Sequence, residues 1–270
     1  MIADGERLGT RRILAISRFI MILLYHHIAP LEARPSAPEP GEGWDFTLSP
    51  EGFEEQLLTL RGRGYRFISL GEMVDDIHKH GAEDNRTAVV TFDDGWVDNH
   101  RFALPVLKRL VITAAFFVTS AHLRNDVQDE RKMSLLQLKE LLAAGVTIGG
   151  HTRSHPDLTA LTIPQARDEI AGCKQDLERL LGLRVAFFAY PGGAFNREVA
   201  RLTQEAGYAA ACSVLGPAPN DATSLFWLYR DVLSESMSTW GDKYRLCPAA
   251  RRLLSFRVVR RLKRKLEEAP

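Results

Sequence analysis

The stretch TAVVTFDDG, residues 87–95, decides the fold of this chain. Its first six residues, Thr87–Phe92, form a short apolar run that is consistent with a buried strand. The run ends on the polar group Asp93-Asp94-Gly95. Helices are predicted on either side of it, over about residues 71–80 and 103–110. A strand between two helices favours a parallel sheet that is covered by helices.

The same alternation of strands and helices runs through most of the sequence. Short apolar runs predict strands at residues 19–25, 66–70, 87–92, 112–119, 146–150, 184–190, 208–214 and 226–233. Apolar spacing and capping residues predict helices at residues 50–64, 71–80, 103–110, 134–144, 163–181 and 196–206. This pattern indicates an α/β fold, and the length fits closure into a barrel. Polar residues follow several strands, at the rim where barrel active sites lie.

Composition limits the class of protein. The 270 residues are 45% hydrophobic and 26% charged, which is typical of a soluble globular protein and excludes disordered, collagen-like and coiled-coil chains. The formal net charge of +1 argues against a dedicated nucleic-acid-binding protein. Cys173, Cys212 and Cys247 are far apart without a C-x-x-C pair, so they indicate reduced thiols and no thiolate zinc site.

The two ends of the chain differ from its central part, which we expect to form one domain over residues 20–235. Residues 1–19 have the composition of a leader segment. Arg18 interrupts the apolar run there and no cleavage signal follows, so we expect an uncleaved cytoplasmic chain. Residues 236–270 form a tail, and its terminal part, 251–270, holds eight Lys or Arg residues and two Glu residues.

Within that tail, residues 251–266 (RRLLSFRVVRRLKRKL) predict an amphipathic helix with a cationic face. Two interpretations are open. The helix packs against the barrel and exposes its basic side to solvent. Alternatively, it attaches the protein peripherally to the anionic inner face of a membrane.

Two short motifs carry the chemistry. His151-Thr152-Arg153-Ser154-His155 places two imidazoles four residues apart, and imidazoles suit zinc and similar divalent ions, although two surface histidines in a loop are the alternative. Asp93 and Asp94 are costly to bury without a cation or hydrogen bonds, unless they form an acidic turn that caps the next helix. Together, Asp94, His151 and His155 make a three-ligand set typical of catalytic zinc sites, and Asp93 is available to accept a proton from water.

Three segments, in this order and at this spacing, resemble the polysaccharide deacetylase domain, carbohydrate esterase family 4. They are TFDDGWVDN (Thr91–Asn99), GGHTRSHPDLTAL (Gly149–Leu161) and FAYPGGAFN (Phe188–Asn196). The family includes chitin, chitooligosaccharide, peptidoglycan and poly-N-acetylglucosamine deacetylases. The resemblance covers about residues 20–235 and implies a distorted (β/α)7-type barrel in a single domain.

The resemblance also implies the activity. It predicts a metal-dependent hydrolase that removes N-acetyl groups from an N-acetylated sugar polymer or oligomer of the N-acetylglucosamine type. A metal-bound water would attack the acetamide carbonyl, with Asp93 as the catalytic base. Asp94, His151 and His155 would hold a divalent metal, zinc first, with cobalt and nickel as alternatives. The N–H of Gly192, which follows Pro191 in a Pro-Gly-Gly turn, would stabilise the oxyanion.

The sequence departs from the family at two positions. Many members carry an arginine where this chain has Ala189, and many carry a late catalytic histidine, whereas no histidine follows His155 here. Arg230 is the expected substitute for the arginine, with an ion pair at the barrel rim as the alternative. For the acid we expect His26, because the chain resembles the poly-N-acetylglucosamine branch, in which an N-terminal Tyr-His supplies it. His27 is the fallback, since only one of two neighbours on a strand faces the cavity.

Further expectations concern the substrate. The rings of Trp96, Phe195, Trp227 and Tyr229 are expected either to line a groove for sugars or to pack in the core. The partner is an N-acetylated glycan whose identity, linkage and length the sequence does not specify. Two other functions remain open: a catalytically silent carbohydrate-binding relative, and an O-acetyl esterase that uses the same metal site.

Overall fold

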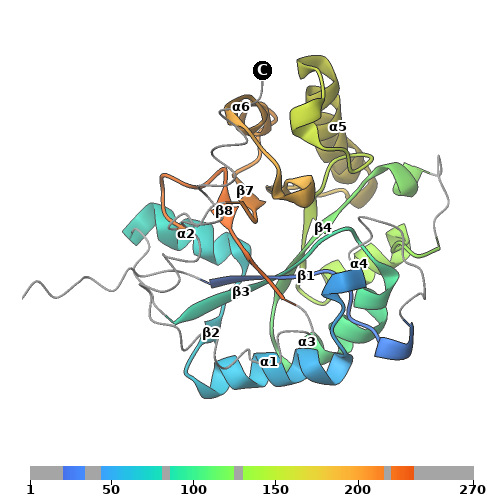
Figure 1. Ribbon diagram of the computed structural model, residues 1–270, viewed down its shortest axis with the longest axis vertical. Coiled ribbons are helices and arrows are strands. Elements are labelled where there is room, and N and C mark those ends of the chain that lie inside the picture. Colours follow the sequence, from blue (N-terminus) through green and yellow to red (C-terminus); the bar gives the residue numbers. More distant parts are fainter. Residues whose placement is uncertain (1–20, 34–43, 81–85, 125–129, 216–219, 234–270) are drawn as a thin grey trace, which may run out of the picture.

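The computed structural model describes residues 21–33, 44–80, 86–124, 130–215 and 220–233 (Figure 1). The expected leader, residues 1–19, and the expected basic tail, residues 236–270, lie outside the described residues, so the predictions made for them stay predictions. Across the described ranges, no helix has the length and apolar character that a membrane crossing requires.

The described strands form one parallel sheet of nine strands in the order β8-β7-β6-β5-β4-β3-β1-β9, with β2 paired to β3. They are β1 (Met21–Tyr25), β2 (Arg66–Phe67), β3 (Thr87–Phe92), β4 (Ala114–Val118), β5 (Thr147–Gly150), β6 (Phe187–Ala189), β7 (Ala210–Ser213), β8 (Leu228–Tyr229) and β9 (Asp231–Val232). Six strands pair one after another in chain order: β1, β3, β4, β5, β6 and β7. Strand β2 pairs only at the side of β3.

Residues 228–232, which we call the closing segment, complete the ring. Its first part, β8, pairs with β7, and its second part, β9, pairs with β1. Arg230 alone separates the two parts, so the strand predicted over residues 226–233 is interrupted at this residue. The sheet is therefore a nearly closed barrel with seven positions around the ring, namely β1, the five strands from β3 to β7, and the closing segment. The prediction of a distorted (β/α)7-type barrel is confirmed.

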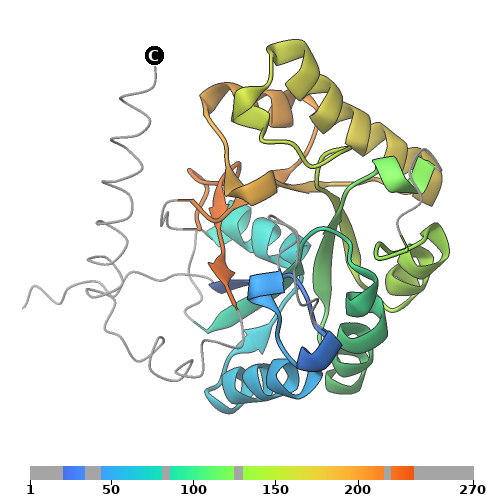
Figure 2. The same ribbon diagram turned by 45° about the vertical axis from the view of Figure 1, so that its right-hand side comes forward.

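Six α-helices lie among the described residues. They are α1 (Pro50–Gly62), α2 (Leu70–His80), α3 (Leu104–Leu110), α4 (Leu135–Ala143), α5 (Ile163–Leu181) and α6 (Arg197–Glu205). Local signals set their ends: the Ser49 side chain accepts the N–H of Gly52 before α1, and Gly182 ends α5 in the left-handed conformation. Figure 2 shows the helices packed around the sheet.

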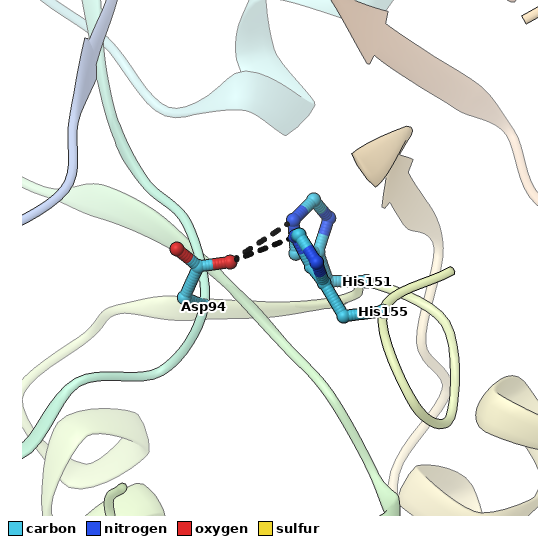
Figure 3. A group of neighbouring side chains, drawn as sticks. All are labelled: Asp94, His151 and His155. Carbon is cyan, nitrogen blue, oxygen red and sulfur yellow. Dashed lines mark ion pairs between the residues drawn. The ribbon is translucent and has the colours of Figure 1, made fainter. Parts of the chain in front are cut away.

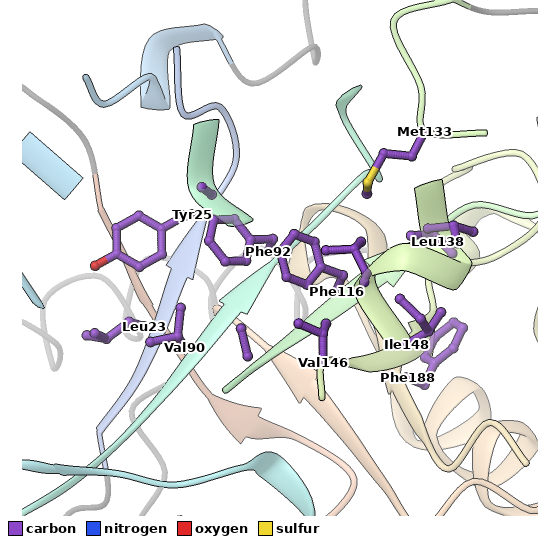
Figure 4. Close-up of a cluster of buried hydrophobic side chains, with 14 of the residues drawn as sticks. Leu23, Tyr25, Val90, Phe92, Phe116, Met133, Leu138, Val146, Ile148 and Phe188 are labelled. Atoms are coloured by element: carbon purple, nitrogen blue, oxygen red, sulfur yellow. The ribbon is translucent and has the colours of Figure 1, made fainter. Parts of the chain in front are cut away.

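The two faces of the strands have different partners. Alternate residues such as Leu23, Val90 and Phe116 point outward and pack with buried residues of α1, α3, α4, α5 and α6 (Figure 4). The residues between them, such as Val89 and Phe117, join a second cluster with one face of α2. Because α2 contacts this inner face and follows β2 at the amino end of β3, it closes the amino-terminal end of the barrel. The carboxyl-terminal end carries the polar residues.

Candidate active site

The inner face of the barrel ends in polar side chains. The alternation of β1 places His26 on the same face as Ile22, and the alternation of β3 places Asp93 on the same face as Val89. The two strands are in register there, and the N–H of Asp93 donates to the carbonyl oxygen of Tyr25 at 3.2 Å. His26 at the end of β1 and Asp93 at the end of β3 therefore lie side by side on the inner face.

Asp94, His151 and His155 come together beside this point (Figure 3). The Oδ1 atom of Asp94 lies 3.3 Å from Nε2 of His151 and 3.2 Å from Nε2 of His155. The three donor atoms all lie within 4.8 Å of one another. The structure thus gathers the three residues that the sequence predicts as metal ligands, from the ends of β3 and β5.

The backbone of this site is strained. Asp94, Thr152 and His155 adopt positive φ angles of 71°, 65° and 66°, and they are three of the four non-glycine residues that do so in the described chain. Such conformations cost about 1–3 kcal/mol each and persist where surrounding contacts determine them. One such contact is the Thr152 hydroxyl, whose oxygen accepts the N–H of His155 at 2.9 Å.

Further hydrogen bonds orient two of the three donors. The Nδ1 atom of His151 lies 2.8 Å from the carbonyl oxygen of Ala189, and because a carbonyl can only accept, Nδ1 carries a proton, which leaves Nε2 as the atom that a neutral His151 offers to a metal. The indole N–H of Trp96 donates to Oδ2 of Asp94 at 3.1 Å, leaving Oδ1 toward the imidazoles. Trp96 is 4% exposed, so its ring supports Asp94 and does not offer a face to a sugar.

The charges at the site favour a bound cation. Burial alone would raise the pKa of Asp94, but hydrogen bonds from His151 and His155 hold that pKa well below its usual value. Burial would likewise lower the pKa of His151, and the carboxylates of Asp93 and Asp94 raise it instead. Two imidazole nitrogens and one carboxylate oxygen, beside a second carboxylate, fit zinc and similar divalent ions.

Asp93 is held by Arg230 of the closing segment. The guanidinium donates from Nη1 to Oδ1 at 2.7 Å and from Nη2 to Oδ2 at 2.6 Å, and Arg230 is 1% exposed. Burial would raise the pKa of Asp93, but Arg230 and His151 lower it, so the carboxyl group is ionised. Arg230 projects from the break in the closing segment, and its guanidinium lies over the ring of Phe117, 5.4 Å from the centroid.

His26 and His27 have opposite surroundings. Burial, then Arg230 and His151, lower the pKa of His26, whereas the charges of Asp94 and Asp93 act against them. Among the described residues, Nδ1 of His26 is buried without a hydrogen-bond partner. The His27 ring is fully buried on the other face of the chain, with Nδ1 2.5 Å from Oδ2 of Asp98.

Comparisons with known proteins agree with this geometry. The family model described as polysaccharide deacetylase matches residues 80–211. YxkH of Bacillus subtilis, named as a candidate polysaccharide deacetylase, is 25% identical over 217 residues, which are 80% of this chain and 72% of YxkH. The solved structure of the deacetylase PplD of Streptococcus pyogenes in complex with acetate has a TM-score of 0.70 and 25% identity, over 82% of this chain and 94% of PplD.

This chain is similar in sequence and in fold to the polysaccharide deacetylase family. A further relative is the peptidoglycan-N-acetylmuramic acid deacetylase PdaA of Bacillus subtilis, which is 30% identical over 189 residues, 69% of this chain and 65% of PdaA. The barrel of this chain carries the Asp/His/His group, and the arginine that contacts Asp93 comes from the closing segment and not from position 189. Ala189 lies on the inner face, where it is fully buried.

The turn at Pro191–Gly193 follows β6. Gly192 has a φ of 58°, and a Cβ atom on Gly193 would lie 2.4 Å from Cγ2 of Val214, so only glycine fits at position 193. Beyond the turn, the ring of Phe195 stacks on Tyr190, which packs in the outer cluster. Phe195 therefore stacks outside the barrel, and its partner Trp227 is 36% exposed.

Sequence reasoning missed the residues that hold the site in place. Asp98 accepts the backbone N–H of Ile28 at 3.3 Å in addition to contacting His27, and Asn99 donates to the carbonyl oxygen of His26 at 2.9 Å. Both lie in the TFDDGWVDN motif, so the motif itself was the available signal. Their partners are about 70 residues away in the chain, and no spacing rule connects them.

Proposed function

We propose that this chain is a divalent-metal-dependent hydrolase that removes N-acetyl groups from an N-acetylated glycan of the N-acetylglucosamine type. One observation carries the proposal: a His-His-Asp donor set adjoins a second carboxylate, Asp93, whose two oxygens are both held by Arg230. Two relatives support the substrate class. PdaA is named for deacetylation of a peptidoglycan sugar, and PplD was solved with acetate, which N-deacetylation releases.

Asp94, His151 and His155 would hold the metal. Their donor atoms are oriented by Trp96 and by the carbonyl oxygen of Ala189, so the set is arranged for a shared ion. When bound, a divalent ion supplies Lewis-acid polarisation of a carbonyl oxygen and lowers the pKa of a water. Zinc is the first candidate, and cobalt and nickel suit the same donors.

Asp93 would act as the general base. Its carboxyl group is ionised because Arg230 offsets the effect of burial on its pKa, and an ionised carboxylate can accept a proton from the attacking water. Arg230 binds both oxygens, so it fixes the plane of the carboxylate. This arrangement supplies the contact that many family members obtain from an arginine at the position of Ala189.

Gly192 and His26 would complete the reaction. Water adds to the acetamide carbon, and the backbone N–H of Gly192 stabilises the negative charge that develops on the oxygen. The C–N bond then breaks, His26 donates a proton to the departing amine, and acetate leaves. His26 is preferred to His27 because it lies on the inner face beside the carboxylates of Asp93 and Asp94, whereas the His27 ring is buried on the other face.

Acetate release tests the proposal. The full chain, supplied with zinc or cobalt, is incubated with N-acetylglucosamine oligomers and with peptidoglycan fragments, and acetate and free amine are both measured. We expect equal amounts of the two products, and a loss of about 10²–10⁴-fold in rate for Asp93→Asn. Acetate without free amine would indicate an O-acetyl esterase. Glycan binding without any acetate would indicate a silent carbohydrate-binding relative.

A further inference from the structure

The loop between the two candidate metal histidines is bonded to helix α5 through one carboxylate. Glu169 accepts the backbone N–H of Arg153 at 2.8 Å and that of Ser154 at 3.0 Å, both on Oε2. Its other oxygen accepts the Ser154 hydroxyl at 2.7 Å. Two consecutive N–H groups that point at one side chain fix the direction of the backbone in the middle of the loop.

The side chain of Arg153 ties the loop to α5 a second time. Its Nε donates to Asp176 at 3.0 Å, and Asp176 also accepts the hydroxyl of Ser120, which follows β4. A Cβ atom on Gly172 would lie 2.3 Å from Cζ of Arg153, so the guanidinium lies directly against the helix backbone. The last of its contacts, Nη1 to Asp168 at 2.7 Å, is on the surface, since the Asp168 side chain is 66% exposed.

The two histidines depend on this loop to different degrees. His151 follows β5 directly, its side chain is 2% exposed, and its Nδ1 is fixed by Ala189. The His155 side chain is 37% exposed, and its backbone has the strained φ of 66°. The position of His155 is therefore set by the conformation of residues 152–154, which Glu169 holds.

We propose that Glu169 is a positioning residue of the metal centre, an inference that rests on the metal-dependent function proposed above. Glu169 keeps the loop in the conformation in which Nε2 of His155 faces Asp94 before a metal binds. Without it, the loop loses three hydrogen bonds, and the metal must order its third ligand as it binds. Loss of an outer partner of a ligand typically weakens metal binding by about 10–100-fold.

The test measures zinc affinity of the metal-free full chain, by competition with a chromophoric chelator. We expect Glu169→Ala to weaken binding by about 10–100-fold. Glu169→Gln should give an intermediate loss, because its amide oxygen can still accept both N–H groups and its amide nitrogen can donate to Ser154. Asp168→Asn is the matched control: it is the neighbouring acid on α5, it contacts only the exposed end of Arg153, and its affinity should stay within about twofold of the unchanged chain.

Thermal unfolding of the metal-free variants shows whether each is folded. If Glu169→Ala does not fold, Glu169→Gln and Ser154→Ala decide the question against Asp168→Asn. Folded Glu169 variants that bind zinc as tightly as the unchanged chain would overturn the inference, and so would equal losses in Asp168→Asn. If the unchanged chain binds zinc but releases no acetate from any glycan, the proposed function fails and this inference stands. If it binds no zinc, both fail.

Discussion

At the scale of single residues, His26 and His27 show how strand alternation separates chemistry from support. His26 faces the inside of the barrel, near the carboxylates of Asp93 and Asp94. The His27 ring packs against two indoles: its centroid is 3.8 Å from the ring centroid of Trp44 and 4.6 Å from that of Trp96. One histidine can meet a substrate, whereas the other can only hold its neighbours.

The two histidines should therefore differ when replaced. We expect His26→Asn to lower kcat for acetate release by about 10²–10⁴-fold, because asparagine cannot donate a proton to the amine, with little change in melting temperature. His27→Leu should lower stability by about 1–3 kcal/mol, because Asp98 loses a buried partner. Kinetics and thermal unfolding of both variants check this. An active His26→Asn beside an inactive, stable His27→Leu would reverse the assignment.

Trp96 gives a second prediction at this scale. Its N–H bonds to the Asp94 oxygen that faces away from the imidazoles, and Phe at this position would keep the ring but remove the donor. We expect Trp96→Phe to weaken zinc binding by about tenfold, while Trp44→Phe, which alters the other ring against His27, leaves zinc affinity unchanged. The measurement is a competition titration, and equal affinities for the two variants would contradict the prediction.

At the scale of elements, the closing segment links barrel closure to Asp93, the proposed general base. Arg230 interrupts β8 and β9 and pairs with Asp93, and both partners are buried. Removing one member of a buried ion pair typically costs about 3–5 kcal/mol, because the other charge is left uncompensated. Removing both charges together costs less.

We therefore expect Arg230→Met to destabilise the metal-free protein by about 3–5 kcal/mol, and the double variant Asp93→Asn/Arg230→Met to regain part of this loss. Urea denaturation of the wild type, the two single variants and the double variant gives the coupling free energy. All three variants should be inactive toward glycans. Additive losses in the double variant would mean that the two side chains do not stabilise the barrel as a pair.

Elements with a strong local signal could be predicted from the sequence, and elements defined by distant pairing could not. Helix α5 and strand β3 have the predicted bounds, because capping residues and an unbroken apolar run mark them. The strand predicted at residues 66–70 shortens to β2, because only its first residues find a partner on β3. The sequence motifs predicted that Asp94, His151 and His155 come together. The hydrogen bonds between Glu169 and the loop depend on how α5 packs against it, and no sequence pattern indicates them.

At the scale of the whole molecule, the candidate metal site joins the ends of β3 and β5 and should stabilise the fold when a metal binds. A ligand that binds only the folded state adds about 4 kcal/mol at a concentration of 1,000 times its Kd. We expect a chelator to lower the melting temperature by several degrees and zinc to restore it, while Asp94→Ala, which removes a ligand, should show no response. Differential scanning fluorimetry measures both, and an equal response in Asp94→Ala would place the stabilising ion elsewhere.

The closing segment also has a consequence for the order in which the protein forms. Strand β1 pairs along one edge with β9, which lies about 200 residues later in the chain. This pairing has by far the longest sequence separation among the described strands. Asp94, His151 and His155 all come from strands made earlier during synthesis. A nascent chain can thus assemble the three proposed metal ligands before Arg230 leaves the ribosome, and Arg230 aligns Asp93, the proposed base, only when β9 pairs with β1 and closes the barrel.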